Sequence, residues 1–75
     1  MITVNLTVGD SGNNVAILQQ FLISQNTGPA AAALAQAGAT GYFGVLTQAA
    51  LAEFQASVGI NPPRGFFGPI TRAYL

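Results

Sequence analysis

The chain offers few side chains that could carry acid–base or nucleophilic chemistry. Its 75 residues include no cysteine and no histidine, and Asp10 and Glu53 are the only carboxylates. Paired acids can cleave a glycosidic bond when folding brings them together, but the spacing of these two gives no reason to expect it. A serine or threonine nucleophile would lack its histidine base. We therefore predict that the chain is not an enzyme, with Asp10 solvated in a turn and Glu53 on a helix face.

The charge balance narrows the classes of ligand. The two acids are matched by two bases, Arg64 and Arg72, so the formal net charge is zero. Because no basic patch is available, binding to nucleic acid is not expected, which argues against a small helix-turn-helix DNA-binding domain. The absence of cysteine and histidine also removes the commonest zinc and copper ligands. We therefore predict no metal and no other cofactor.

The apolar stretches of the chain are too short to span a membrane. The longest runs from Pro29 to Ala35, well below the roughly 20 residues that a spanning helix needs. The first residues lack the basic and apolar regions of a signal peptide. If the parent protein is exported, we expect its signal to lie outside this fragment.

The most informative pattern is an internal repeat. Residues 41–51 and 65–75 both read G-(Y/F)-F-G-x-(L/I)-T-x-A-x-L. Two glycines that bracket an aromatic pair are typical of a turn with positive φ or close backbone approach. Pro69 stands where the first residue of a helix is expected. Each copy is therefore predicted to be a turn that leads into a helix, and the two turns should lie close together because both helices enter one core.

The aromatic pair of each copy is predicted to divide between the core and the surface. Phe43 and Phe67 precede the second glycine and are expected to fold onto the following turn, as in a hydrophobic staple. Tyr42 and Phe66 are then the more exposed pair. An exposed aromatic face suits a sugar ring, and the tyrosine hydroxyl adds a polar group. The alternative for Tyr42 is that it only covers its turn.

Four polar side chains near the repeats have both a structural and a binding interpretation. Thr47 and Thr71 lie where a hydroxyl can satisfy free backbone groups at a helix start. Gln19 and Gln55 each follow a core residue of a helix, and their amides could reach a ligand or tie the helix to a neighbouring loop. The structural role is favoured for all four, and Thr47 is kept as a candidate ligand contact.

Three outward-facing positions add possible polar contacts to a ligand. Gln48 and Arg72 occupy the variable position after each threonine, and Arg64 directly precedes the second copy. Either arginine could pair with a carboxylate of a peptide, although a solvated side chain is the simpler interpretation.

One domain, residues 1–75, is predicted to carry these side chains. Apolar and polar side chains alternate over residues 1–8, which indicates an extended N-terminal arm packed on one side. Asn13 or Asn14 is expected to cap the first helix. The predicted helices span residues 14–24, 29–37, 45–58 and 69–75.

The predicted fold class is all-α, a compact three-helix bundle with an extra short Ala-rich helix and an extended arm. A chain of this length buries only about 60% of the surface that it exposes when unfolded, so tight packing must stabilise it. Leu34 is the only large apolar residue of the Ala-rich helix and is expected to dock it. The predicted core includes Leu18, Phe43, Phe54 and Phe67.

Three blocks of glycine, apolar and polar residues follow one another along nearly the whole chain. They are Leu6-x-x-Gly9-x-x-Gly12-x-x-Val15-x-x-Leu18-Gln19-x-x-Leu22, then Gly41-x-Phe43-Gly44-x-x-Thr47-x-x-Ala50-x-x-x-Phe54-Gln55-x-x-x-Gly59, and finally Gly65-x-x-Gly68-Pro69-x-Thr71. Together they resemble the peptidoglycan-binding domain family of the small three-helix type. A single G-x-x-G-x-x-T is a weak signal, but three blocks in this order are fairly specific.

The chain departs from that family at two places. Thr40 and Arg64 stand before the two turns, where an acidic residue is common in the family. Residues 28–38 are also longer than a simple loop, which suggests an added short helix that reshapes one wall of a groove.

The resemblance implies a non-catalytic module that binds peptidoglycan and holds an attached protein against the bacterial wall. The attached protein would be a cell-wall enzyme or another exported domain, located outside the cytoplasm in the wall or periplasm. The alternative is a protein-interaction or assembly module that keeps the fold without binding glycan, which the sparse charge and missing turn acids favour. The candidate ligand-binding residues are Tyr42, Phe66, Thr47, Gln48, Arg64 and Arg72.

Overall fold

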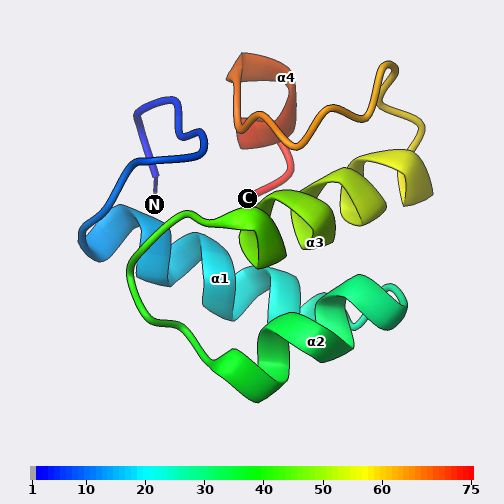
Figure 1. The fold of residues 1–75 in the computed structure, drawn as a ribbon. Coiled ribbons are helices and arrows are strands. Elements are labelled where there is room, and N and C mark those ends of the chain that lie inside the picture. Colours follow the sequence, from blue (N-terminus) through cyan, green and yellow to red (C-terminus); the bar gives the residue numbers. More distant parts are fainter. Residues whose placement is uncertain (1) are drawn as a thin grey trace.

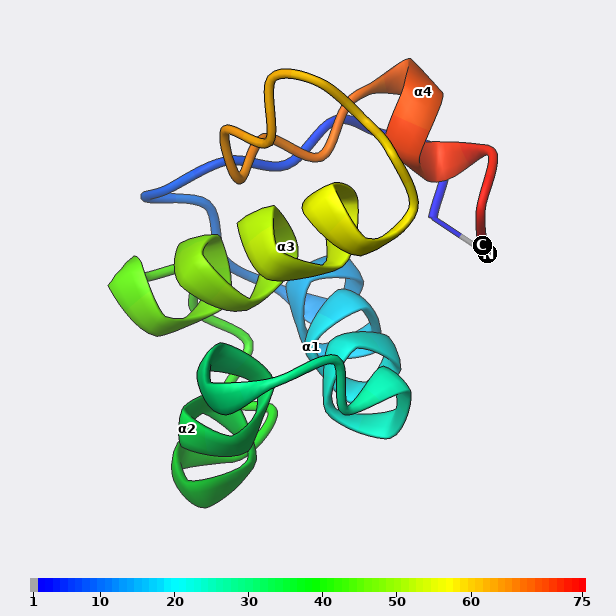
Figure 2. The same cartoon turned by 90° about the vertical axis from the view of Figure 1, so that its right-hand side faces the viewer.

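The computed structural model describes residues 2–75 and shows four helices joined by loops (Figure 1). The helices are α1 (Asn13–Gln25), α2 (Pro29–Ala37), α3 (Val45–Ser57) and α4 (Pro69–Arg72). α1, α2 and α3 pack against one another, and Figure 2 shows α4 and the N-terminal arm on the side of α3 away from α2. Residues 2–75 contain no β-strand, so the predicted all-α bundle is confirmed.

Proline opens two of the four helices. Pro29 and Pro69 are the first residues of α2 and α4, where a missing N–H costs no hydrogen bond. The first three helices differ from their predicted ranges by no more than one residue at either end. α4 is shorter than the predicted 69–75, because the chain tightens after one turn. The Leu75 N–H bonds the Arg72 carbonyl only three residues back, at 3.1 Å.

The N-terminal arm connects the two repeat loops, residues 41–44 and residues 65–68. Leu6 and Phe67 exchange two backbone hydrogen bonds, of 3.0 and 2.8 Å. Phe43 donates to the Asp10 carbonyl at 2.8 Å and accepts from the Gly9 N–H at 2.9 Å. The arm therefore holds the first and second repeat loops next to each other.

The predicted alternation of the arm is wrong in detail. Ile2 and Leu6 are buried, but Val4 and Val8 are exposed. The reason is that the arm has only isolated bridges to the loops and no continuous partner strand, so it is not pleated along its length. Met1, also part of the predicted arm, lies outside the described residues.

The side-chain cap predicted for α1 is also wrong. α1 begins directly after Gly12, and neither Asn13 nor Asn14 makes a capping hydrogen bond. The Gly12 N–H bonds instead to the Gly41 carbonyl at 2.8 Å, so the pairing of arm and first repeat loop sets the start of α1.

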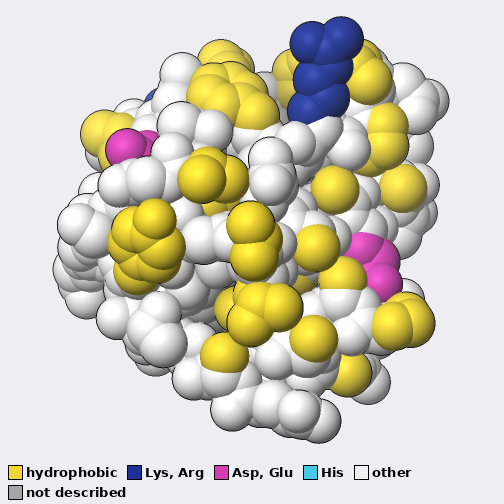
Figure 3. All heavy atoms as spheres, in the orientation of Figure 1, with side chains coloured by type: hydrophobic (Ala, Val, Ile, Leu, Met, Phe, Trp, Pro, Cys, Tyr) yellow, Lys and Arg dark blue, Asp and Glu magenta, His cyan; other side chains and the backbone are white. Residues whose placement is uncertain are grey.

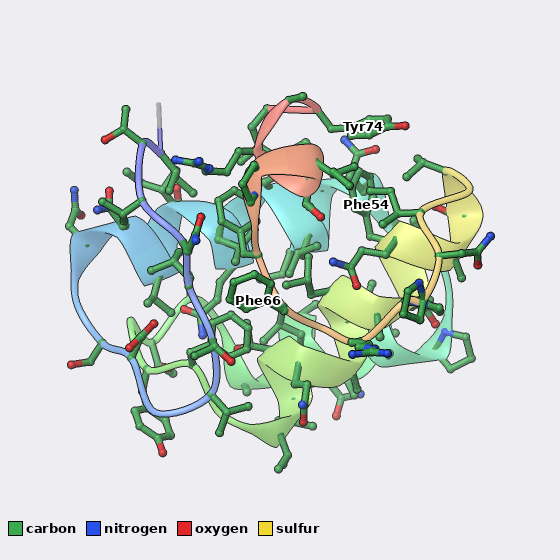
Figure 4. The ribbon with its side chains drawn as sticks, turned by 90° about the horizontal axis from the view of Figure 1, so that it is seen from above. Phe54, Phe66 and Tyr74 are labelled. Carbon is green, nitrogen blue, oxygen red and sulfur yellow. The ribbon has the colours of Figure 1, made fainter. Side chains whose placement is uncertain are left out.

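The core includes the four residues named as core from the sequence pattern. Leu18, Phe43 and Phe67 are fully buried, and Phe54 is 3% exposed. Phe54 contacts Phe21 and Tyr74 edge to face, with ring centroids 5.1 and 6.0 Å apart, and Figure 4 shows it next to Tyr74. Leu34 is buried and docks α2 on the bundle.

Candidate functional site

One buried glutamine of α1 holds the first repeat loop. The Gln19 Nε2 donates to the Tyr42 carbonyl and to the Thr47 hydroxyl, both at 2.9 Å. The Gln19 Oε1 accepts from the Gly41 N–H at 2.8 Å. Both ends of the buried amide are therefore satisfied within the fold.

Gln55 of α3 holds the second repeat loop in the same way. Its Nε2 donates to the Phe66 carbonyl at 2.7 Å and to the Thr71 hydroxyl at 3.0 Å, and its Oε1 accepts from the Gly65 N–H at 2.9 Å. The structural role favoured for both glutamines is the one that the geometry supports.

The two threonines do not cap their helices as predicted. Neither α3 nor α4 has a side-chain capping bond. The Thr47 and Thr71 hydroxyls accept hydrogen bonds from the glutamine amides. Thr47 is only 1% exposed, so it offers almost no surface to a ligand. Its contribution is to fix the first repeat loop.

The exposed aromatic ring of each loop lies over the second glycine of its own motif. A Cβ added at Gly44 would lie 3.2 Å from a ring carbon of Tyr42, and one added at Gly68 would lie 2.6 Å from a ring carbon of Phe66. Tyr42 is 55% exposed and Phe66 is 44% exposed. The second glycine is therefore needed for close approach of the ring, whereas the first has a positive φ of 86° or 73°.

A surface hollow adjoins each ring. The Tyr42 hollow, about 270 Å³, lies between the end of α2 and the start of α3. The Phe66 hollow, about 320 Å³, lies between the connector after α3 and the start of α4. Figure 4 shows Phe66 well separated from Phe54 and Tyr74. The Tyr42 hollow is lined mainly by Leu34, Ala37, Thr40, Tyr42, Val45 and Leu46, and the Phe66 hollow by Ile60, Asn61, Pro62, Arg64, Phe66 and Ile70.

The two hollows differ in charge. Arg64 lines the Phe66 hollow, is exposed, and forms no hydrogen bond or ion pair with another residue of the described chain. Thr40 occupies the equivalent place in the Tyr42 hollow, which has no charged lining residue within residues 2–75. Figure 3 shows the same sparseness on the face that it presents, where charged side chains are isolated among hydrophobic and uncoloured atoms.

Two of the predicted ligand contacts lie outside both hollows. Arg72 is partly buried, and its Nη1 donates to the Thr3 carbonyl, which fastens the N-terminal arm to α4. Gln48 is exposed but packs against Gly65 of the second repeat loop. The structure thus places Tyr42 and Thr47 at one hollow and Phe66 and Arg64 at the other.

Glu53 lies on α3, as expected, but it also makes contacts that the sequence did not suggest. Its carboxylate is partly buried and accepts hydrogen bonds from the Thr27 hydroxyl at 2.8 Å and from the Ala30 and Ala31 N–H groups at 3.0 and 3.1 Å. These bonds, first among them that of Ala30, lower the pKa of Glu53, against the opposing effect of burial. A carboxylate of α3 therefore caps the start of α2.

One feature of the sequence, the glycine before α2, indicates weakly that another residue must cap this helix. Gly28 precedes α2 and has no side chain that could cap it, so the helix start needs a partner from elsewhere. Asp10, the other carboxylate, accepts from the Thr7 N–H at 2.9 Å in its predicted turn. Neither carboxylate lines a hollow.

Two further findings concern the described part of the chain. Residues 2–75 contain no cluster of His, Cys, Asp or Glu side chains that could hold a metal ion. No helix over the same residues has the length and apolar character needed to cross a membrane.

Comparison with known protein families matches residues 11–75 to the family described as "Putative peptidoglycan binding domain". The matched span contains both repeat loops, both glutamines that hold them and both hollows. Searches of curated proteins and of solved structures find no match for the chain.

Proposed function

The chain belongs to the peptidoglycan-binding domain family, and we propose that it is a non-catalytic module that binds peptidoglycan through its two repeat loops. The observation that carries the proposal is the exposed aromatic ring beside a hollow in each repeat. Tyr42 and Phe66 each rest on a glycine in a loop that a buried glutamine holds. Such rings present preformed apolar faces to sugar or peptide, which limits the ordering cost of binding.

The proposal assigns no catalytic step to the chain. Asp10 and Glu53 both accept hydrogen bonds within the fold, Asp10 in the turn of residues 7–10 and Glu53 at the start of α2. With few polar groups at the hollows, affinity is expected to be modest. The role of such a module is to hold an attached cell-wall enzyme or other exported domain against the wall, outside the cytoplasm.

Binding to purified murein sacculi tests this proposal. We expect the wild-type domain to sediment with sacculi, and the double variant Tyr42→Ala/Phe66→Ala to remain largely in the supernatant. Val8→Ala is the matched control, because Val8 is also an exposed apolar residue but lines neither hollow. Equal sedimentation of the double variant and wild type would contradict the assignment of the two rings.

The second candidate function is a protein-interaction or assembly module. It is favoured by the high exposure of two apolar side chains in the first turns of α3 and α4, Val45 at 73% and Ile70 at 68%. This candidate predicts no enrichment on sacculi and concentration-dependent self-association in sedimentation velocity. Sedimentation with sacculi by a monomeric domain would reject it.

A further inference from the structure

We propose that the two hollows are separate sites for chemically different parts of peptidoglycan. The Phe66 hollow takes a carboxylate-bearing segment of the stem peptide, and the Tyr42 hollow takes an uncharged sugar ring. This inference rests on the proposed function and assigns a ligand class to each half of the domain.

The two hollows are built in the same way. Each has a glutamine-held loop at its base, an aromatic ring braced on a glycine, and an exposed apolar residue from the first turn of the next helix. A hollow with the same backbone construction can accept a ligand at the same place relative to its ring. The equivalent lining pairs are Gln19 and Gln55, Tyr42 and Phe66, and Leu46 and Ile70.

The two hollows differ in charge at one equivalent position. Arg64 directly precedes the first glycine of its loop, and Thr40 does so in the other. The Arg64 guanidinium has no carboxylate partner in the described chain, and no acidic residue lines the Phe66 hollow. A guanidinium beside an apolar wall recognises a carboxylate on an aliphatic segment, because it can donate two parallel hydrogen bonds.

The Tyr42 hollow has a different complement of groups. Its polar side chains at the surface are the hydroxyls of Tyr42 and Thr40, and no charge is present to favour an anion. A hydroxyl-bearing ring can stack on the tyrosine face and exchange hydrogen bonds with these hydroxyls. The walls from Leu34 and Ala37 of α2 complete an apolar surface that suits the ring face of a sugar.

Two sites on so small a domain would act together on a polymer. The domain measures 26 × 26 × 19 Å, and peptidoglycan repeats both sugars and peptides along its length. When one site is occupied, the other meets its ligand at high effective concentration. Weak individual contacts would therefore give firmer attachment to sacculi than to small fragments.

Titration followed by amide chemical shifts tests the division. The probes are soluble muropeptides with free carboxylates, the same muropeptides with amidated carboxylates, and the neutral sugar diacetylchitobiose. We expect the free acid to shift amides around Phe66 and Ile70 and to bind about three- to five-fold more tightly than the amidated form. Chitobiose should shift amides around Tyr42 and Leu46.

Matched variants are obtained by exchanging the residues at the position where the two hollows differ, Arg64 and Thr40. Arg64→Thr should remove the preference for the free acid, and Thr40→Arg should create one at the Tyr42 hollow. Arg64→Gln is a second variant in case the first fails to fold. Equal binding of acid and amide by the wild type would overturn the inference, as would chitobiose shifts confined to the Phe66 hollow.

The sacculus assay separates this inference from the proposed function. A domain that sediments with sacculi but does not distinguish acid from amide keeps the proposed function and loses the division of sites. A domain that does not sediment with sacculi, and binds none of the probes, loses both.

Discussion

The two repeats share a loop but lead into very different helices. The first repeat loop starts α3, a helix of 13 residues whose buried face lies in the core, and the second starts α4, a helix of only 4 residues. Yet the same three hydrogen bonds to a glutamine hold both loops. The unit that recurs is therefore the loop with its glutamine, and the length of the helix that follows is free to vary.

The repeats are also connected in series. Gln19 of α1 holds the loop that starts α3, and α3 carries Gln55, which holds the loop that starts α4. The first repeat thus supports the second, whereas α4 carries no glutamine that could hold a further loop in the same way. Equivalent glutamine hydrogen bonds in the two repeats should therefore contribute unequally to the stability of the domain.

The largest effect is expected where the two repeats share the core. Phe54→Ala removes a ring that contacts both Phe21 of α1 and Tyr74 after α4. We expect a loss of about 3–5 kcal/mol in the free energy of unfolding, a large fraction of the stability of so small a domain. Urea denaturation measures it, and a loss below about 1 kcal/mol would contradict the central place given to this ring.

Removal of the glutamines tests the serial connection. Replacing either glutamine by leucine, as Gln19→Leu or Gln55→Leu, keeps a similar side-chain volume. Each variant leaves one carbonyl, one N–H and one hydroxyl of its repeat loop without a hydrogen-bond partner. Each of these groups that stays buried should lower the free energy of unfolding by about 1–3 kcal/mol. Gln55→Leu should raise hydrogen exchange of the Gly65 amide only. Gln19→Leu should raise that of both Gly41 and Gly65. Loss of protection confined to Gly41 would show that the loops are independent.

Only the Tyr42 hollow has a wall formed by α2, and substitution of Glu53, which caps α2, tests the importance of that wall. The pKa of Glu53 is lowered on folding from an ordinary value of 4.5, mainly by the Ala30 N–H. The stabilisation is therefore fully present above that value and is lost as pH falls through the lower, folded-state pKa. We expect Glu53→Gln to lower the melting temperature at neutral pH, and the gap to wild type to narrow in acid.

A second readout locates the effect of Glu53→Gln. The variant should shift amides near the Tyr42 hollow, because α2 supplies Leu34 and Ala37 to it, and leave the Phe66 hollow nearly unchanged. A gap in melting temperature that stays constant from neutral to acid pH would contradict the carboxylate cap.

The smallest effect on stability is expected at the surface rings. Tyr42→Ala should change the free energy of unfolding by no more than about 0.5 kcal/mol, because the side chain is 55% exposed. It should nevertheless weaken binding of muropeptides. A large fall in melting temperature without a specific loss of binding would assign Tyr42 to the core instead.

Much of the fold follows from local patterns in the sequence. Proline and glycine mark the limits of α2, and the apolar period of α3 identifies its buried face. The repeat itself predicts that Phe43 and Phe67 share a role, and both are fully buried. These features depend on residues within one or two turns of each other, where spacing alone fixes geometry.

The features that could not be predicted join residues far apart in the chain. Glu53 reaches Ala30, 23 residues away, and Arg72 reaches Thr3 across 69 residues. The threonines illustrate the same limit. A hydroxyl at a helix start has backbone groups within reach, but at Thr47 the bond is instead to a glutamine 28 residues distant. Which residues line which hollow depends on these long-range contacts.

The ring of Tyr42 or Phe66 lies on a residue that has no side chain of its own. Nothing has to swing aside before an incoming molecule reaches the aromatic face. Encounter should therefore be limited by diffusion and orientation, and weak attachment should show itself as rapid release. A domain that binds in this way would exchange rapidly between neighbouring positions on a polymer.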